Sequence, residues 1–170
     1  MSLTPALTHV GLLALQAAKA GGEPVVLSQL ALGSAPRLPT HDEEALVAPF
    51  VTAPISSHTL NPGTGQLDLG VQIDGAAAGL TQDYVIHEAG LFDQLGRLIF
   101  YFASPDSLAA ITPRTAYALN VAVVMAPADA AVIQIIDQGP NWAAVAEGMI
   151  AALEARTRLA SFRNLFLAQS

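Results

Sequence analysis

Apolar residues recur at helical spacing near the start of the chain and at every second position through its middle. The first pattern predicts an amphipathic helix over residues 6–20. Thr4 is placed to cap this helix, and Pro5 suits its first turn. Gly21 and Gly22 are expected to end it. The apolar positions of this predicted helix are Leu7, Val10, Leu13 (or Ala14) and Ala17.

The middle of the chain has the pattern of strands joined by short turns. One alternating run begins at residue 50 and another at residue 67, with the turn-forming residues 61–65 between them, which indicates a β-hairpin. A tight turn at residues 93–96 joins two further strands. Residues 104–113 are predicted to form a loop. The predicted strands cover residues 24–32, 50–60, 67–73, 84–92, 97–103, 115–125 and 131–136.

The acidic stretch from Asp42 to Glu44 leaves two local structures open. Carboxylates favour the start of a helix, so residues 42–47 could form one helical turn. A solvated loop fits the same residues equally well.

Residues 141–168 have the pattern of one long helix. A helix of about 28 residues is about 42 Å long, which is more than a small sheet needs to cover itself. Arg156 and Arg163 interrupt its apolar face, which suits carboxylates on a partner subunit. We therefore predict contacts with another polypeptide, with a helix folded back on its own sheet as the alternative. The predicted interface residues are Trp142, Val145, Met149, Leu153, Arg156, Leu159, Phe162, Arg163 and Phe166.

This order of elements predicts an α+β fold. It consists of an N-terminal helix, an antiparallel β-sandwich-like or rolled sheet of about six or seven strands, and a long C-terminal helix. Two parts are expected. Residues 1–138 form the helix-plus-sheet body, and residues 139–170 form a C-terminal helix for oligomerisation or partner binding.

Composition and charge narrow the classes of partner. Charged residues make up 12% of the chain, whereas about 25% is usual, so part of the apolar surface is expected to face other protein. An alanine-rich composition explains the same number equally well. The net charge is −7, and residues 1–140 hold 12 acids and 4 bases, which argues against nucleic acid as a partner. No apolar run approaches about 20 residues, so membrane insertion is not expected.

Candidate chemistry in the sequence is sparse. There is no cysteine, and the four histidines have no metal-ligand spacing, so we predict no metal and no cofactor. No nucleotide-binding motif is present. Ser57 and His58 place a hydroxyl beside an imidazole, but no third member of a triad can be assigned. A small hydrolase built on these two residues is the alternative function from a different class.

Glu88 stands alone in an otherwise apolar strand, and two interpretations compete. Burial could tune it as a general base. The favoured interpretation is structural, because an unpaired buried carboxylate is unfavourable: Glu88 accepts hydrogen bonds from loop backbone or pairs with Arg97 or Arg114. On a continuous strand, Ile86, Glu88 and Gly90 would share one face.

The segment around Glu88 resembles the N-terminal family of phage tail-fibre proteins. Residues 85–93 read V-I-H-E-A-G-L-F-D and residues 96–99 read G-R-L-I. The family carries I-x-E-x-G-L-F-D, a short turn and G-x-L-I. Other pieces occur in the family's order over about residues 4–136: T-x-x-G-L-x-A-L at 8–15, A-L-G at 31–33, A-L-V at 45–47 and A-P-I-S at 53–56. The core motif residues are Glu88, Gly90, Leu91, Phe92, Asp93 and Gly96.

This resemblance implies a structural protein of the virion tail, with no catalytic residue. It implies a baseplate-attachment domain at the head of a homotrimeric fibre, made in the host cytoplasm. The implied partners are the chain itself, a baseplate wedge protein and a distal fibre or receptor-binding protein. In the family a repetitive shaft and a receptor-binding tip follow, whereas these 170 residues hold no shaft. We therefore expect a short fibre or an adaptor. The same module in a phage-tail-like bacteriocin or injection particle, and a fibre-assembly chaperone, are alternatives.

Overall fold

The computed structural model describes residues 5–139 and shows a mostly β body. Strands hold 47% of these residues and helices 11%. The predicted α+β class is therefore wrong. The chain forms more strands than the hydrophobic pattern indicated, and the helices among the described residues are both short. The predicted long helix over residues 141–168 lies outside the described residues.

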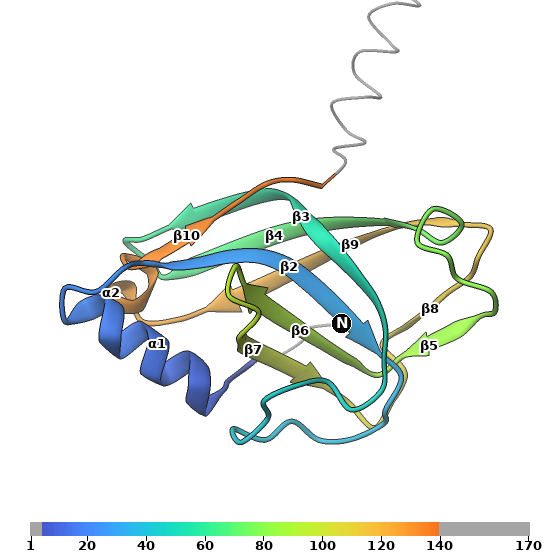
Figure 1. Cartoon of the computed structure of the whole chain (residues 1–170), viewed down its shortest axis with the longest axis horizontal. Coiled ribbons are helices and arrows are strands. Elements are labelled where there is room, and N and C mark those ends of the chain that lie inside the picture. Colours follow the sequence, from blue (N-terminus) through green and yellow to red (C-terminus); the bar gives the residue numbers. More distant parts are fainter. Residues whose placement is uncertain (1–4, 140–170) are drawn as a thin grey trace, which may run out of the picture. The chain divides into compact units, whose positions relative to one another are not determined.

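The strands form one large curled sheet and one small sheet (Figure 1). The described elements are β1 (Ala6–Leu7), α1 (His9–Lys19), β2 (Val25–Gly33), β3 (Pro49–Asn61), β4 (Gln66–Asp74), β5 (Tyr84–Ile86), β6 (Glu88–Asp93), β7 (Leu98–Ala103), β8 (Ala109–Ile111), β9 (Ala116–Val124), α2 (Pro127–Ala130) and β10 (Ile133–Ile135). In the large sheet the order is β1-β7-β6-β2-β3-β4-β9, and β10 pairs with β2. The small sheet consists of β5 and β8.

The N-terminal helix begins later than predicted. Pro5 precedes β1, and α1 starts only after Thr8, whose side-chain oxygen accepts a hydrogen bond from the Gly11 amide. The cap is therefore Thr8 and not Thr4, which lies outside the described residues. Both threonines have the right chemistry for a cap. The choice depends on β7, because the Thr8 amide donates to the Ile99 carbonyl at 3.1 Å.

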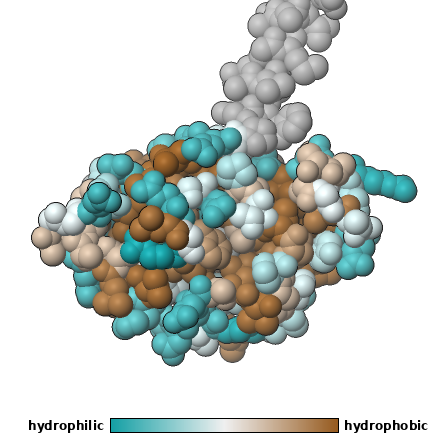
Figure 2. Space-filling model, viewed as in Figure 1, coloured by the Kyte–Doolittle hydropathy of each residue, from teal (hydrophilic) through white to brown (hydrophobic). Residues whose placement is uncertain are grey.

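The buried face of α1 is made of small residues and one leucine. These are Gly11, Ala14, Leu15 and Ala18. Of the predicted face, Ala14 is buried, but Leu13 and Ala17 are exposed. Leu7 lies in β1, so the predicted face is wrong except for the Ala14 alternative. Small residues let the helix lie close to the sheet. Leu12 and Leu13 are left exposed, and Figure 2 shows apolar surface at this end of the body.

The long strand β3 connects the two halves of the large sheet. Its first half pairs with β2, and its second half pairs with β4. The register shifts between Ile55 and Ser57, which is a β-bulge, and bulges bend strands. The halves of the sheet therefore face each other around one main core. Its largest fully buried members include Leu15, Leu27, Leu30, Leu32, Ile55, Leu67, Leu69, Ile86, Leu91 and Phe102.

The predicted hairpin over residues 50–73 is confirmed, but the predicted strand over residues 84–92 is split. The break is at His87, which belongs to neither strand. Its amide donates to the Gly33 carbonyl, and its carbonyl accepts from the Ser104 amide. Residues before it form β5 and residues after it form β6, in different sheets. Ile86 consequently packs into the main core with Leu91, and not on the same face as Glu88 as predicted.

Two further features differ from the expected antiparallel sheet. The predicted loop over residues 104–113 contains β8. The last strand, β10, pairs with β2 in parallel, with Ile133 opposite Val25.

Residues 42–47 form no helical turn, so the loop alternative holds there, although Leu46 is buried. No helix among residues 5–139 is both long and apolar enough to cross a membrane.

Candidate functional site

Glu88 lies at the centre of the motif at residues 85–93 and is completely buried. Its carboxylate accepts hydrogen bonds from the Tyr101 hydroxyl at 2.7 Å, the Ala48 amide at 2.8 Å and the Val47 amide at 3.2 Å. The predicted acceptance of loop-backbone hydrogen bonds is confirmed. Neither Arg97 nor Arg114 is its partner among the described contacts; Arg97 pairs with Asp93 instead. A carboxylate held by three donors ties residues 34–48 to the sheet.

Two glycines make room for this arrangement. Gly33 is paired with Glu88 across β2 and β6, and a Cβ at Gly33 would collide with the Glu88 carboxylate. A Cβ at Gly90 would lie 2.5 Å from Leu46 Cδ1 and 2.6 Å from Leu98 Cδ1. Leu46 therefore fits into a small second core on the side of the sheet opposite the main core. The other members of this cluster are Ala31, Leu98 and Tyr101.

Tyr101 donates its hydroxyl hydrogen to the Glu88 carboxylate. Its side chain is fully buried, and Arg37 lies over its ring at 5.8 Å from the centroid. Burial, together with the hydrogen bond to Glu88 and the negative charge of Glu88, raises the pKa of Tyr101 well above its ordinary value of 10.0. Arg37 acts in the opposite direction and also pairs with Glu43.

This shift predicts a pH dependence. A group whose pKa is raised by folding contributes stability that is complete below its unfolded pKa and is lost as the pH rises through its folded pKa. Tyr101 is therefore expected to stay protonated above pH 10. The difference in absorbance at 295 nm between the wild type and Tyr101→Phe, followed during alkaline titration, measures this directly. A Tyr101 midpoint at or below its ordinary value would contradict the geometry.

The second half of the motif builds the predicted tight turn. Asp93 is 1% exposed, and its carboxylate accepts from the Leu95 amide at 3.0 Å and the Arg97 amide at 2.8 Å. The Arg97 guanidinium closes the turn with an ion pair at 2.7 Å to the same carboxylate. Gly96 has a φ of +76°, a conformation that side chains disfavour. The turn prediction over residues 93–96 is confirmed, and Asp93 and Arg97 both have a structural role in it.

The opening motif docks α1 onto β7. Thr8 is completely buried, and its hydroxyl donates to the Leu98 carbonyl at 2.5 Å while accepting from the Gly11 amide at 2.9 Å. A Cβ at Gly11 would collide with the Ile99 carbonyl oxygen. The threonine and glycine of T-x-x-G thus join helix and sheet. Sequence reasoning missed this role of Thr8, the partnership of Tyr101 with Glu88, and the spacing role of Gly33.

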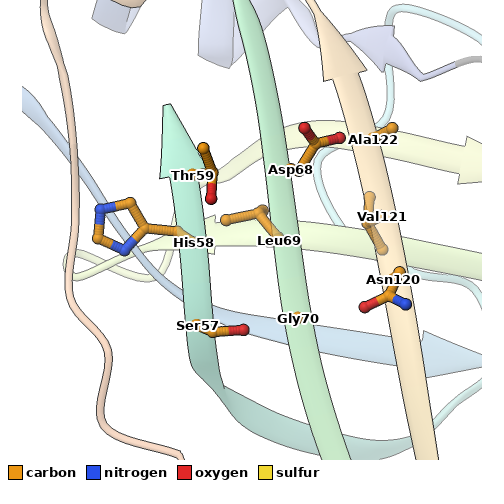
Figure 3. A pocket seen from close by; sticks show the side chains of 9 residues that line it. All are labelled: Ser57, His58, Thr59, Asp68, Leu69, Gly70, Asn120, Val121 and Ala122. Carbon is orange, nitrogen blue, oxygen red and sulfur yellow. The ribbon is translucent and has the colours of Figure 1, made fainter. Parts of the chain in front are cut away.

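The candidate hydrolase pair does not converge. Ser57 lies opposite Gly70 and His58 opposite Leu69 in the β3–β4 ladder, so their side chains point to opposite faces of the sheet. Figure 3 shows the two side chains directed away from each other. His58 Nδ1 instead lies 2.8 Å from both carboxylate oxygens of Asp137. The imidazole therefore links β3 to the segment after β10 and is not directed at Ser57.

A shallow hollow of about 360 Å³ lies on the outer face of β3, β4 and β9, which is the face turned away from the main core (Figure 3). Its floor is Gly70, and Ser57, Thr59, Asp68 and Asn120 are the polar side chains around it. No cluster of three metal-ligating side chains exists within residues 5–139. The predicted interface residues from Trp142 to Phe166 lie outside the described residues, so that prediction stays open.

The comparison with protein families identifies residues 1–135 with the N-terminal domain of the phage tail-collar fibre protein. The chain belongs to this tail-fibre family. The comparisons with curated proteins and with solved structures found no match. The family match includes Thr8, Gly11, Glu88 and the turn at residues 93–96. In the structure these residues make hydrogen bonds that hold the elements of the domain together.

Membership in the tail-fibre family places the chain among structural components of the virion tail. The carboxylates of Glu88 and Asp93 are both occupied by donors from the chain itself. The family match over residues 1–135 confirms the expected resemblance.

Proposed function

We propose that this tail-fibre domain attaches a fibre to the baseplate, or adapts one tail component to the next, and has no enzymatic activity. The observation that carries the proposal is the family match over residues 1–135. The internal use of the motif residues supports it, because their side chains hold the domain together and are not directed to a ligand. The proposed partners are a baseplate wedge protein and a distal fibre or receptor-binding protein.

The segment after β10 supports a connecting role. The Ile136 amide donates to Leu27, and the amides of Gln138 and Gly139 donate to Ile55. Together with the pair between His58 and Asp137, these bonds hold the chain against β2 and β3 up to residue 139. The proposed connecting segment therefore follows a stretch that is hydrogen-bonded to the body. We propose that residues 141–168 contact other subunits of a homotrimer or the next fibre protein.

The oligomer is tested with charge reversals in the C-terminal segment. Arg156→Glu is expected to dissociate a trimer, because it places a carboxylate on the predicted apolar face. Arg158 lies two positions after Arg156 in the predicted helix, which places it about 200° around the axis and so on the opposite face. Arg158→Glu is therefore the matched control and should leave the mass unchanged. Sedimentation equilibrium of the purified full chain, 17.6 kDa per copy, measures the difference. A monomeric wild type would refute the proposed homotrimer, and equal behaviour of the two variants would refute the role of Arg156 in its interface.

The attachment role is tested in the particle. Mass spectrometry of purified particles should find the chain, and electron microscopy of particles made without it should show tails lacking fibres. Absence of the chain from mature particles would instead indicate an assembly chaperone. The genes beside it would distinguish a phage from a phage-tail-like bacteriocin or injection particle.

A further inference from the structure

The strand β9 leaves one edge of the large sheet without a partner strand in the described part of the chain. β9 pairs with β4 over its whole length without a break in register and is the last strand in the sheet order. At one end of the ladder the Gly75 amide donates to the Thr115 carbonyl. Since hydrogen-bonded pairs alternate in an antiparallel ladder, the backbone N–H and C=O groups of Ala118, Asn120 and Ala122 point away from β4.

The free edge of β9 carries none of the features that usually prevent edge strands from pairing. Such strands are blocked by charged side chains, proline or bulges. β9 reads A-Y-A-L-N-V-A-V-V and has an unbroken register. Ala118, Asn120 and Ala122 are exposed. A nine-residue, uncharged and accessible edge suits the addition of an extended segment from another chain through backbone hydrogen bonds.

Charge next to this edge indicates what kind of segment would fit. Asp68 on β4 lies directly beside Ala122 on β9, and Figure 3 shows the two side by side at the hollow. The Asp68 carboxylate accepts a hydrogen bond from Gln66, and none of the ion pairs within residues 5–139 includes it. Strands are spaced about 4.8 Å apart. A lysine or arginine on a strand added beside β9 can therefore extend across the small Ala122 to Asp68.

We propose that β9 accepts an extended basic segment of another protein as an additional strand, with a Lys or Arg side chain crossing Ala122 to pair with Asp68. This rests on the proposed attachment role and states what kind of segment the partner would use. A second copy of the chain fits less well, because each copy has a net charge of −7 and would bring its own Asp68 to the same edge.

The proposal is tested with the full chain and two synthetic nine-residue peptides, one alternating valine with lysine and one alternating valine with glutamate. The lysine peptide should bind, and amide hydrogen exchange at Ala118, Asn120 and Ala122 should slow by about tenfold or more. The Val121 amide, which faces β4, should change little. Equal binding of the glutamate peptide, or unchanged exchange at the three amides, would overturn the proposal.

Two variants separate the backbone contribution from the charge. Ala118→Pro removes an N–H that β4 does not use, and peptide affinity should fall about tenfold, since one edge hydrogen bond is lost and the strand is blocked. Asp68→Asn should weaken binding about two- to fivefold at low salt and reduce its salt dependence. Asp106→Asn, at an exposed acid between β7 and β8, is the matched control and should have no effect.

Two outcomes of these experiments lead to different conclusions. If the free chain is already associated, with the three amides of β9 protected, a second copy holds the edge and the proposal is overturned. If Asp68→Asn and Asp106→Asn behave alike, the ion pair is wrong. The readout of the proposed attachment role is incorporation into particles. A failure of peptide binding is therefore distinguishable from a failure of that role.

Discussion

Replacing Glu88 with alanine is expected to destabilise the domain by at least about 1–3 kcal/mol, the loss for leaving one buried donor without its acceptor. The change leaves the buried Tyr101 hydroxyl and the partly buried amides of Val47 and Ala48 without their acceptor. Each unsatisfied buried donor costs about 1–3 kcal/mol. Residues 34–48 should also lose their attachment to the sheet, so proteolysis is expected within this loop first.

Urea unfolding followed by circular dichroism measures this loss of stability. Glu88→Gln retains one carbonyl acceptor and should show an intermediate loss. Glu44→Ala, at an exposed acid in the same loop, is the matched control and should shift the midpoint little. If Glu88→Ala and Glu44→Ala unfolded at the same urea concentration, the carboxylate would not hold the loop.

Replacing Gly11 with alanine is expected to reverse the usual sign of such a change in a helix. In a helix interior, alanine is ordinarily more favourable than glycine by about 1 kcal/mol. Here the added Cβ would collide with the Ile99 carbonyl oxygen, which is backbone and cannot turn aside. Overpacking of this kind costs about 1–3 kcal/mol and would push α1 away from β7, so a net loss of stability is expected.

A second helix substitution provides the comparison for Gly11. Gln16→Ala lies on the exposed side of α1 and should leave the thermal midpoint unchanged or raise it slightly. Differential scanning calorimetry of the two variants gives opposite shifts if the close contact with Ile99 exists. A Gly11→Ala variant more stable than the wild type would show that α1 does not rest on β7 in this way.

The parts of the fold that local chemistry controls could be predicted from the sequence. The β3–β4 hairpin follows from alternation on both sides of the turn at residues 61–65, and the turn at residues 93–96 follows from an aspartate and a glycine at the positions that such turns favour. The parallel pairing of β10 could not be predicted, because a three-residue strand carries no sign of its partner. The predicted α+β class was wrong because the sequence pattern showed too few strands: three-residue strands such as β8 have the pattern of a loop.

The candidate site was predicted in part. Burial of a lone carboxylate among apolar neighbours indicated that Glu88 needs donors, and loop amides were among the expected ones. Tyr101 could not be identified, because it lies thirteen positions away on the next strand and only the register of β6 with β7 brings it close. Gly33 gave no signal either, since its close approach to Glu88 depends on the pairing of β2 with β6.

The parallel pair between β2 and β10 has a consequence for synthesis. Val25 emerges from the ribosome early, but its neighbour Ile133 emerges only when the body is almost complete. Pairings between distant parts of a chain form slowly. A truncated translation product would thus lack β10 and leave residues 25–27 of β2 without their parallel partner. Pairing of β2 with β10 therefore waits for a residue that is made 108 positions after its partner.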